Sequence, residues 1–333
     1  MTRKLLVLLL CILPLWSKNV RIATYNVENL FDLHFNHSEY VEYIPNTSWQ
    51  WNATTYRIKL DHIAKTIIDI NADIIALQEI ESAQALKDLK KRLNQQGLYY
   101  PYSAIADAKE STVKVALLSK YPLAYSKELW VTSNLQYRNI LEAKILIDNH
   151  PIYLFVNHWK SKSGSESKRI ISAKVLKKRL QTLGYDKAII VLGDFNSHYD
   201  EASTFVRKRK LNDTNGITGI NHILNTTSLS SNDMLTCKEC LYNLWYDTPM
   251  EKRWSHIYRK QKEALDNIIV SAPLLQNQGF IYRQHSIKHA DLPYLLKKEN
   301  PYRWQYSKTH PKHHIGKGYS DHLPVYADFT LTS

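Results

Sequence analysis

Cysteine is scarce in this chain, with three residues among 333. Cys11 lies in an apolar N-terminal segment, which leaves Cys237 and Cys240 in a CKEC arrangement. A closed zinc site needs four ligands, and there is no second CxxC to complete one. We therefore expect a small loop disulfide between Cys237 and Cys240, which an exported protein permits, rather than a redox or metal site.

Long apolar runs are also missing, except for one at the N-terminus. Arg3 and Lys4 precede an apolar run from Leu5 to Leu15, which has the length of a signal-peptide core and is short for a bilayer. We predict a signal peptide over residues 1–17, with cleavage near Ser17. The mature chain is then secreted or periplasmic and has no membrane span.

Acidic residues are outnumbered, at 31 Asp and Glu against 44 Lys and Arg, and the formal net charge is +13. Such an excess favours a polyanionic partner, either nucleic acid or an anionic membrane surface, although a generally basic proteome has the same effect. Hydrophobic residues make up 44% of the chain, which is enough for a sizeable core and argues against wholesale disorder. The length suits one large α/β domain or two small ones.

The chain has no repeats and no low-complexity linker, and its pattern alternates between strands and helices. Apolar residues recur at helical spacing from Leu60 to Ile70 and from Ala173 to Leu183, with a further helix expected at Ala83–Leu93. Asn149 and His150 mark a hairpin turn. Residues 228–263 and 282–318 are polar, aromatic and irregular, which indicates long surface loops or insertions. Strands are expected at Val20–Tyr25, Asp73–Leu77, Val113–Leu118, Leu141–Ile147, Ile152–Val156, Ala188–Leu192, Ile268–Val270 and Val325–Phe329.

Short polar motifs follow several of these strands, where α/β folds gather their sites. Each alone has an ordinary explanation, such as a turn former, a helix cap or a structural histidine. Their joint occurrence in one order is far more specific. In chain order they are TYNVENL with Asn26, LQEI with Glu79, NHWKS with Asn157 and His158, GDFNS with Asp194 and Asn196, LDN with Asp266, and SDHLPV with Asp321 and His322.

These residue types match the needs of phosphodiester cleavage. A hard divalent cation takes oxygen ligands from Asp, Glu and Asn. Histidine can activate water or protonate a leaving oxygen near neutral pH. Neutral donors such as Asn hold phosphate without repelling it and stabilise charge that develops in the transition state.

The motifs, from Asn26 to His322, resemble the endonuclease/exonuclease/phosphatase (deoxyribonuclease I-like) superfamily. The stretch NHWKSKSGSESKR is most similar to bacterial extracellular nucleases of that superfamily. The resemblance implies an α/β four-layer sandwich, with two mixed β-sheets packed face to face and helices on both outer sides. It also implies one catalytic domain over residues 18–333.

The resemblance further implies a role for each motif residue and a divalent metal, Mg²⁺ in the first place, with Ca²⁺ or Mn²⁺ possible. His322 is expected as general base or phosphate donor, oriented by Asp266, and His158 as general acid. No carboxylate that would orient His158 is evident, and Glu110 is the one candidate. The expected metal residues are Glu79, Asp321 and Asn26; the catalytic residues His158, His322, Asp266, Asp194 and Asn196; and the phosphate-binding residues Arg138 and Asn157.

The expected substrate is nucleic acid, DNA and/or RNA, with endonucleolytic cleavage of DNA by a monomer as the leading expectation. Non-specific affinity for nucleic acid comes mainly from phosphate neutralisation. A basic cluster beside His158 could follow a nucleic-acid backbone, and a loop over residues 294–314 interleaves aromatic and basic residues that could stack on bases. The cluster consists of Lys160, Lys162, Lys168 and Arg169, and the loop carries Tyr302, Trp304 and Tyr306 with Lys297, Lys298, Arg303 and Lys308.

Three alternatives stay open. A secreted sphingomyelinase-type lipid phosphodiesterase would need an exposed apolar or aromatic hairpin for membrane docking, and Trp245 with Tyr246 leaves that option. A phosphoinositide phosphatase is less compatible with export. A non-catalytic binding module on the same fold should have lost some of the catalytic residues, and all are present.

Overall fold

The computed structural model describes residues 17–205, 209–227, 234 and 236–332. The predicted signal peptide therefore lies, except for Ser17, outside the described residues. In the described part of the chain, no helix is both long enough and apolar enough to cross a membrane.

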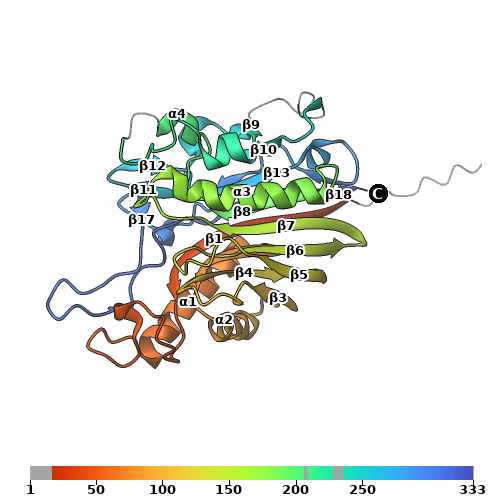
Figure 1. Ribbon diagram of the computed structural model, residues 1–333. Coiled ribbons are helices and arrows are strands. Elements are labelled where there is room, and N and C mark those ends of the chain that lie inside the picture. The colour runs from red at the N-terminus through yellow and green to blue at the C-terminus, as the bar shows by residue number, and fades with distance from the viewer. Residues whose placement is uncertain (1–16, 206–208, 228–233, 235, 333) are drawn as a thin grey trace, which may run out of the picture.

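Two mixed seven-stranded sheets form the centre of the molecule (Figure 1). The first has the order β14-β18-β1-β2-β4-β3, with β15 also paired to β18, and the second has the order β5-β6-β7-β8-β13-β10-β9. The first sheet contains β14 (Phe280–Tyr282), β18 (Val325–Thr332), β1 (Ser17–Leu30), β2 (Ile74–Ile80), β4 (Lys114–Ser119), β3 (Tyr102–Ile105) and β15 (Lys288–His289). The second contains β5 (Leu123–Leu129), β6 (Ile140–Ile147), β7 (His150–His158), β8 (Ile189–Asp194), β13 (Asp266–Val270), β10 (Leu241–Asn243) and β9 (Thr226–Thr227).

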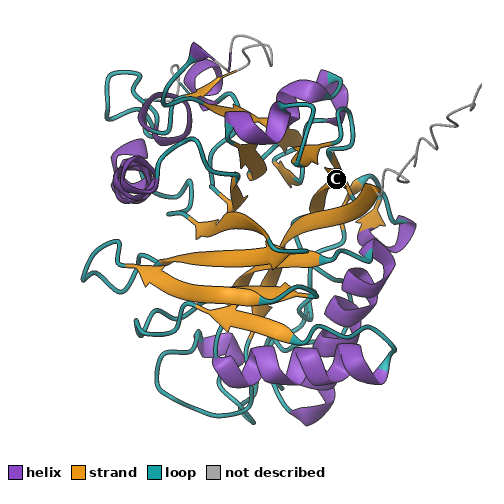
Figure 2. Cartoon of the chain, turned by 90° about the vertical axis from the view of Figure 1, so that its right-hand side faces the viewer, coloured by secondary structure: helices purple, strands orange, loops and turns teal. Residues whose placement is uncertain are grey.

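Helices cover the outer faces of both sheets, so strands occupy the middle of the molecule with helices on either side (Figure 2). The α-helices are α1 (Ala53–Ile70), α2 (Ala83–Gln95), α3 (Glu166–Leu183) and the short α4 (Glu201–Thr204). Shorter helical turns are η1 (Val41–Tyr43), η2 (Gly219–Ile223), η3 (Leu244–Asp247), η4 (Met250–Lys252), η5 (Ala272–Leu275) and η6 (Pro293–Leu295). The three helices expected from apolar spacing are all present. α1 begins seven residues before Leu60, because the side chain of Asn52 caps the amides of Thr54 and Thr55.

Three buried apolar clusters define four layers. One cluster joins the facing sides of the two sheets and includes Ala76 of β2 and Leu192 of β8. A second packs α1 and α2 on the first sheet, and a third packs α3 on the second sheet through Leu176 and Leu180. The predicted four-layer sandwich is confirmed.

Two small hairpins lie in the segments expected to be irregular. β11 (His256–Tyr258) pairs with β12 (Gln261–Glu263), and β16 (Leu296–Lys297) pairs with β17 (Asn300–Pro301). In Figure 1, β11, β12 and β17 lie at the left end of the sandwich, opposite the C-terminus. The expectation of surface loops is only partly right, because Trp245 and Trp304 in these segments are fully buried.

In three hairpins, both residues of the two-residue turn have positive φ. β6 and β7 are joined by Asp148 and Asn149, so the turn lies one residue earlier than predicted. The other two turns have Arg259 with Lys260 and residues 298–299 at the positions with positive φ.

Candidate functional site

Strand register brings the polar residues of the second sheet together. His158 of β7 and Asp266 of β13 both pair with Asp194 of β8, so the three lie in one row across neighbouring strands. Side chains alternate between the faces of a strand. Leu192 and Val156 belong to the cluster between the sheets, so Asp194 and His158, each two residues further along, also point between the sheets.

Gly193 allows β7 and β8 to approach closely at this row. Its φ is +134°, and a Cβ at this position would lie 2.1 Å from the carbonyl oxygen of Asn157. Any other residue would push the two strands apart. The glycine of GDFN therefore fixes the spacing of the site.

Glu79 reaches the site from the first sheet through a β-bulge. Strict alternation would place Glu79 on the helix-covered face together with Leu77. The pairing of β2 with β4 shifts register between Gln78 and Ile80, and Glu79 has φ +67°. The bulge turns this side chain toward the site, a common use of bulges at functional positions.

Asn26 links the two sheets at the centre of the site. Its Nδ2 donates to Oε1 of Glu79 and to Oδ2 of Asp194, each at 3.1 Å. The backbone N–H of Asn196 donates to Oδ1 of Asp194 at 2.8 Å, and its Nδ2 donates to Oδ2 at 3.2 Å. Asp194 is therefore held by three protein donors in a fixed orientation.

His322 is oriented by Asp266. Nδ1 of His322 lies 2.7 Å from Oδ2 of Asp266, which also accepts from the Ser255 hydroxyl at 2.6 Å. Nε2 is left free to face Oδ2 of Asp194 at 3.9 Å. Burial lowers the pKa of His322, but the charges of Asp266 and Asp194 outweigh burial and raise the pKa well above its ordinary value.

His158 approaches the same carboxylate. Its Nε2 lies 3.6 Å from Oδ2 of Asp194 and 3.8 Å from Oε1 of Glu79. Burial, followed by the charge of Arg138, lowers the pKa of His158 well below its ordinary value. Nδ1 of His158 is buried without a hydrogen-bond partner and Glu110 is exposed, so the suggested pairing with Glu110 is wrong.

Four residues join the predicted set without having been singled out as part of the site. Glu28 accepts from Nε and Nη2 of Arg303, at 3.0 and 2.6 Å, and Nη2 also lies 3.7 Å from Oδ2 of Asp321. Lys59 lies fully buried close by, with Nζ donating to the carbonyl of Tyr319 at 2.9 Å. Burial and the charge of Asp321 raise the pKa of Glu28 to about 8, and burial lowers the pKa of Lys59 to about 8.

His256, the fourth of these residues, packs on His322. Its ring lies 4.8 Å from the ring of His322, and the two residues form an isolated antiparallel bridge. Glu28 lies within the quoted TYNVENL motif, so sequence offered a signal for it. Lys59, His256 and Arg303 lie outside the six motifs. Arg303 was expected in the substrate-binding loop over residues 294–314, but only the fold shows that it reaches Glu28 and Asp321.

The donor set suits a hard divalent cation. Asp194, Asp266 and His322 place ligand atoms within 4.8 Å of one another. Because Asp266 and His322 bond to each other, we favour the oxygens of Glu79, Asp194 and Asp321, with Asn26 in support. Burial and then the charge of Asp321 raise the pKa of Glu79, and burial raises the pKa of Asp194 to about 7, so crowded carboxylates there would gain from a cation.

A cavity of about 990 Å³ opens at these residues. Arg138, the predicted phosphate-binding arginine, lines the cavity, with Nη1 3.5 Å from the carbonyl of Trp159. Among the described residues, five lysines and arginines line the cavity, together with three histidines and six acidic residues. The lysines and arginines are Arg138, Lys162, Lys210, Arg259 and Arg303, and the acidic residues are Glu28, Glu42, Glu79, Asp194, Glu263 and Asp321.

Asn157 is not placed to bind phosphate. It points to the opposite face of β7 from His158 and is fully buried. Its Nδ2 donates to the carbonyls of Phe155 and Leu192, and its Oδ1 accepts from the indole of Trp159. We therefore assign Asn157 to the support of the strand ends rather than to the substrate.

The expected basic and aromatic surfaces are also smaller than predicted. Arg169 is fully buried, bonds to Glu166 at 2.7 Å and orders the loop before α3 through three carbonyls. Lys162 pairs with Glu201 and Glu263 at 2.9 and 3.2 Å. Trp304, at 1% exposure, cannot stack on a base, whereas Tyr306 lines the cavity.

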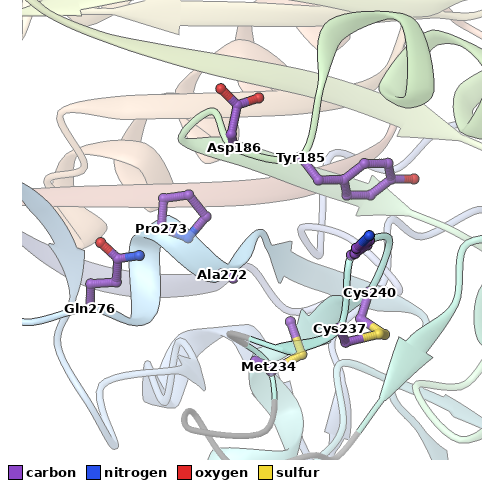
Figure 3. Close-up of a pocket in the computed structure, with 9 residues that line it drawn as sticks. Tyr185, Asp186, Met234, Cys237, Cys240, Ala272, Pro273 and Gln276 are labelled. Carbon is purple, nitrogen blue, oxygen red and sulfur yellow. A yellow bond between two sulfur atoms is a disulfide. The ribbon is translucent and has the colours of Figure 1, made fainter.

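The predicted disulfide between Cys237 and Cys240 is present. A second cavity, of about 270 Å³, lies beside it (Figure 3). Tyr185 and Asp186 contribute to its wall, and Pro273 and Gln276 come from the η5 region (Figure 3). None of the predicted site residues lines it.

Comparison with known proteins agrees with this geometry. The model of the endonuclease/exonuclease/phosphatase family matches residues 21–330. The chain belongs to this family. A comparison with curated proteins finds no match. The predicted closeness to bacterial extracellular nucleases stays a prediction.

Several solved structures share the fold of this chain. TDP2 from D. rerio complexed with a single-strand DNA product is 13% identical, with a TM-score of 0.58, over 93% of this chain and 98% of that chain. A mannosyl-6-phosphatase from Bacteroides thetaiotaomicron is 14% identical, with a TM-score of 0.55, over 93% and 99%. An endonuclease/exonuclease/phosphatase family protein from the same species is 13% identical, with a TM-score of 0.55, over 95% and 99%. At such identities these likenesses concern the fold alone.

Proposed function

We propose that this chain is an exported, Mg²⁺-dependent phosphodiesterase that hydrolyses nucleic acid endonucleolytically as a monomer. One observation carries the reaction class: Nε2 of His158 and Nε2 of His322 both face Oδ2 of Asp194, at 3.6 and 3.9 Å, at a cavity rich in carboxylates. Two imidazoles supply the proton acceptor and the proton donor that displacement at phosphorus with an alkoxide leaving group requires.

A divalent cation held by Glu79, Asp194 and Asp321 would neutralise phosphate oxygens and lower the pKa of a bound water. Asn26 keeps Glu79 and Asp194 apart at a fixed spacing through its two hydrogen bonds. Arg138 lines the cavity and can bind a phosphate oxygen from the side of His158.

The two histidines divide the proton transfers. The pKa directions make His158 a neutral acceptor and His322 a charged donor, which is the reverse of the roles that the resemblance implies. A bound cation would lower the pKa of His322, because it would offset the charge of Asp194. With its pKa so lowered and its tautomer fixed by Asp266, His322 can act as the base. The negative charge of a bound phosphate would raise the pKa of His158, so that His158 can hold the proton that it passes to the leaving oxygen.

Nucleic acid is favoured among the substrates by the net charge of the chain and by what a protein of similar fold binds. The net charge of +13 suits a polyanion. The related fold of TDP2 has been seen with a single-strand DNA product. The sphingomyelinase alternative loses most of its supporting feature, because Trp245 is fully buried and cannot dock on a membrane, and the half-buried Tyr246 packs on Tyr199.

The test uses the chain of residues 18–333 with Mg²⁺, incubated with closed circular DNA, RNA, sphingomyelin and a sugar phosphate monoester. We expect nicking of the circles and loss of activity in EDTA. His322→Ala and Asp194→Ala should abolish cleavage without changing the circular dichroism spectrum. Cleavage of the lipid or the monoester alone would overturn the proposal, as would full activity in either variant.

A further inference from the structure

The β11–β12 hairpin forms one wall of the catalytic cavity. Tyr258, Arg259 and Gln261 of this hairpin line the cavity together with His158 and His322. The hairpin is fixed at its base, since His256 bridges to His322 and Glu263 pairs with Lys162 at 3.2 Å. The tip therefore has a defined position relative to the catalytic histidines.

The tip carries positive charge in a conformation that its residues do not favour. Arg259 and Lys260 occupy the two turn positions, with φ of +47° and +67°. A two-residue turn of this kind favours Asn followed by Gly, because other side chains are strained at positive φ. The β6–β7 turn uses better-suited residues, Asp148 and Asn149, at the same positions.

Strain alone does not locate a function, because Lys298 and Glu299 form a similar turn between β16 and β17. Neither of those residues lines the catalytic cavity, whereas Arg259 does. The position of the charge therefore distinguishes the β11–β12 turn.

Arg259 also differs in its partners from two of the other cations of the cavity. Lys162 and Arg303 are neutralised by carboxylates. Among the residues that the structure describes, no carboxylate forms an ion pair with Arg259 or Lys260, and the Arg259 guanidinium lies 5.2 Å from the ring of the half-exposed Tyr258. An unpaired guanidinium beside an exposed aromatic ring suits the backbone and a base of a nucleic-acid strand.

We propose that Arg259 and Lys260 bind phosphates of the substrate strand beside the phosphate that is cleaved, and that Tyr258 stacks on a base there. This inference rests on the proposed function. The tip is three residues beyond His256, or about 10 Å at a strand rise of about 3.3 Å per residue. In a DNA duplex the phosphates of one strand follow each other about every 3.4 Å along the helix axis, so the tip would reach phosphates within about three of the cleaved bond.

The test replaces the tip by the favoured turn residues, in the double variant Arg259→Asn/Lys260→Gly. Two substrates are compared: a single-stranded 12-nucleotide DNA and bis(p-nitrophenyl) phosphate, which has no flanking phosphate. We expect kcat/KM on the oligonucleotide to fall about five- to tenfold at low salt, as the loss of two exposed charge contacts implies. The slope of log(kcat/KM) against log salt concentration should become shallower by about 1 to 2. Hydrolysis of the small diester should be unchanged and Tm should rise.

The matched control is Lys298→Asn/Glu299→Gly, which relieves the same strain at a turn away from the cavity. We expect a similar rise in Tm and no change on either substrate. Unchanged oligonucleotide kinetics in the Arg259 and Lys260 variant would overturn the inference and leave the proposed function standing. An unaltered chain that cleaves the small diester but no oligonucleotide would also overturn it. A chain that cleaves neither of these substrates and does not nick closed circular DNA would remove the proposed function and this inference together.

Discussion

The hydrogen bond between Asp266 and His322 offers the sharpest test of the site. In Asp266→Asn the side chain keeps its size, so the fully buried pocket around it stays filled. The carboxylate accepts from Nδ1 of His322 at 2.7 Å and from Ser255 at 2.6 Å. An amide that presents its NH₂ group to Nδ1 forces the tautomer in which Nε2 carries the proton and cannot act as a base.

The expected loss follows from that change of tautomer. In a serine protease triad the same substitution lowers kcat about 10⁴-fold, or about 5 kcal/mol in activation free energy. We expect a loss of about 10³- to 10⁴-fold in kcat on plasmid DNA, with little change in KM. The charge of Asp266 is also one cause of the raised pKa of His322, so the pH limb that belongs to His322 should move to lower pH.

The assay is the initial rate of plasmid nicking between pH 5 and 9, at saturating Mg²⁺. Asp328→Asn serves as the control, because Asp328 is a partly buried carboxylate that also has a basic partner, Arg21 at 2.8 Å, and it does not line the cavity. We expect the control to keep its activity and pH profile. Activity of Asp266→Asn above a tenth of the unaltered rate, with an unshifted profile, would refute the role given to Asp266.

Three further predictions address proton transfer, acid stability and a buried ion pair. If His158 protonates the leaving oxygen, His158→Ala should lose about 10²- to 10⁴-fold on DNA but far less on bis(p-nitrophenyl) phosphate, whose leaving group needs no proton; equal losses on both would contradict that role. Nδ1 of neutral His314 accepts from the indole of Trp304 at 2.8 Å, and burial lowers the pKa of His314 from 6.5 to about 4. The unfolded state therefore takes up the proton first, so the stability from neutral His314 is complete above pH 6.5 and falls by about 3 kcal/mol as pH drops to about 4. Urea unfolding at several pH values measures this fall, which His314→Gln should reduce. Arg169→Ala leaves Glu166 buried without its partner and should lower the free energy of unfolding by about 3 to 5 kcal/mol, whereas a loss below 1 kcal/mol would show that the pair is dispensable.

The order of strands and helices could be predicted because each has a simple periodicity. Apolar runs such as Ala188–Leu192 became β8, and the spacing from Leu60 to Ile70 became most of α1. The polar motifs at the strand ends were also predictable. Asn26, Asp194 and Asp266 each lie an even number of residues from the apolar residues of the same strand that face the other sheet, so they point the same way. By the same alternation, Asn157 and His158 are neighbours that point to opposite faces of β7, which would have excluded Asn157 from the site.

Glu79 shows what periodicity cannot supply. Alternation along β2 directs it to the helix-covered face, and only the bulge between Gln78 and Ile80 turns it back. A bulge depends on how one strand pairs with its neighbour, and that pairing is a property of the folded sheet. Lys59, which is buried near the acidic residues, depends on the packing of α1 in the same way.

Charge illustrates a second limit of sequence, because a count of lysines and arginines does not distinguish free cations from paired ones. Two of the four basic residues predicted to follow a backbone beside His158 are neutralised, Arg169 by Glu166 and Lys162 by two carboxylates. In the described lining of the cavity, acidic residues slightly outnumber lysines and arginines, so the net charge of +13 does not describe it. A polyanion would instead be held by the few cations without a carboxylate partner, such as Arg138 and Arg259, together with a bound divalent ion. Removal of Mg²⁺ should therefore weaken the binding of DNA as well as stop its cleavage, and equal affinity for DNA with and without Mg²⁺ would contradict this account.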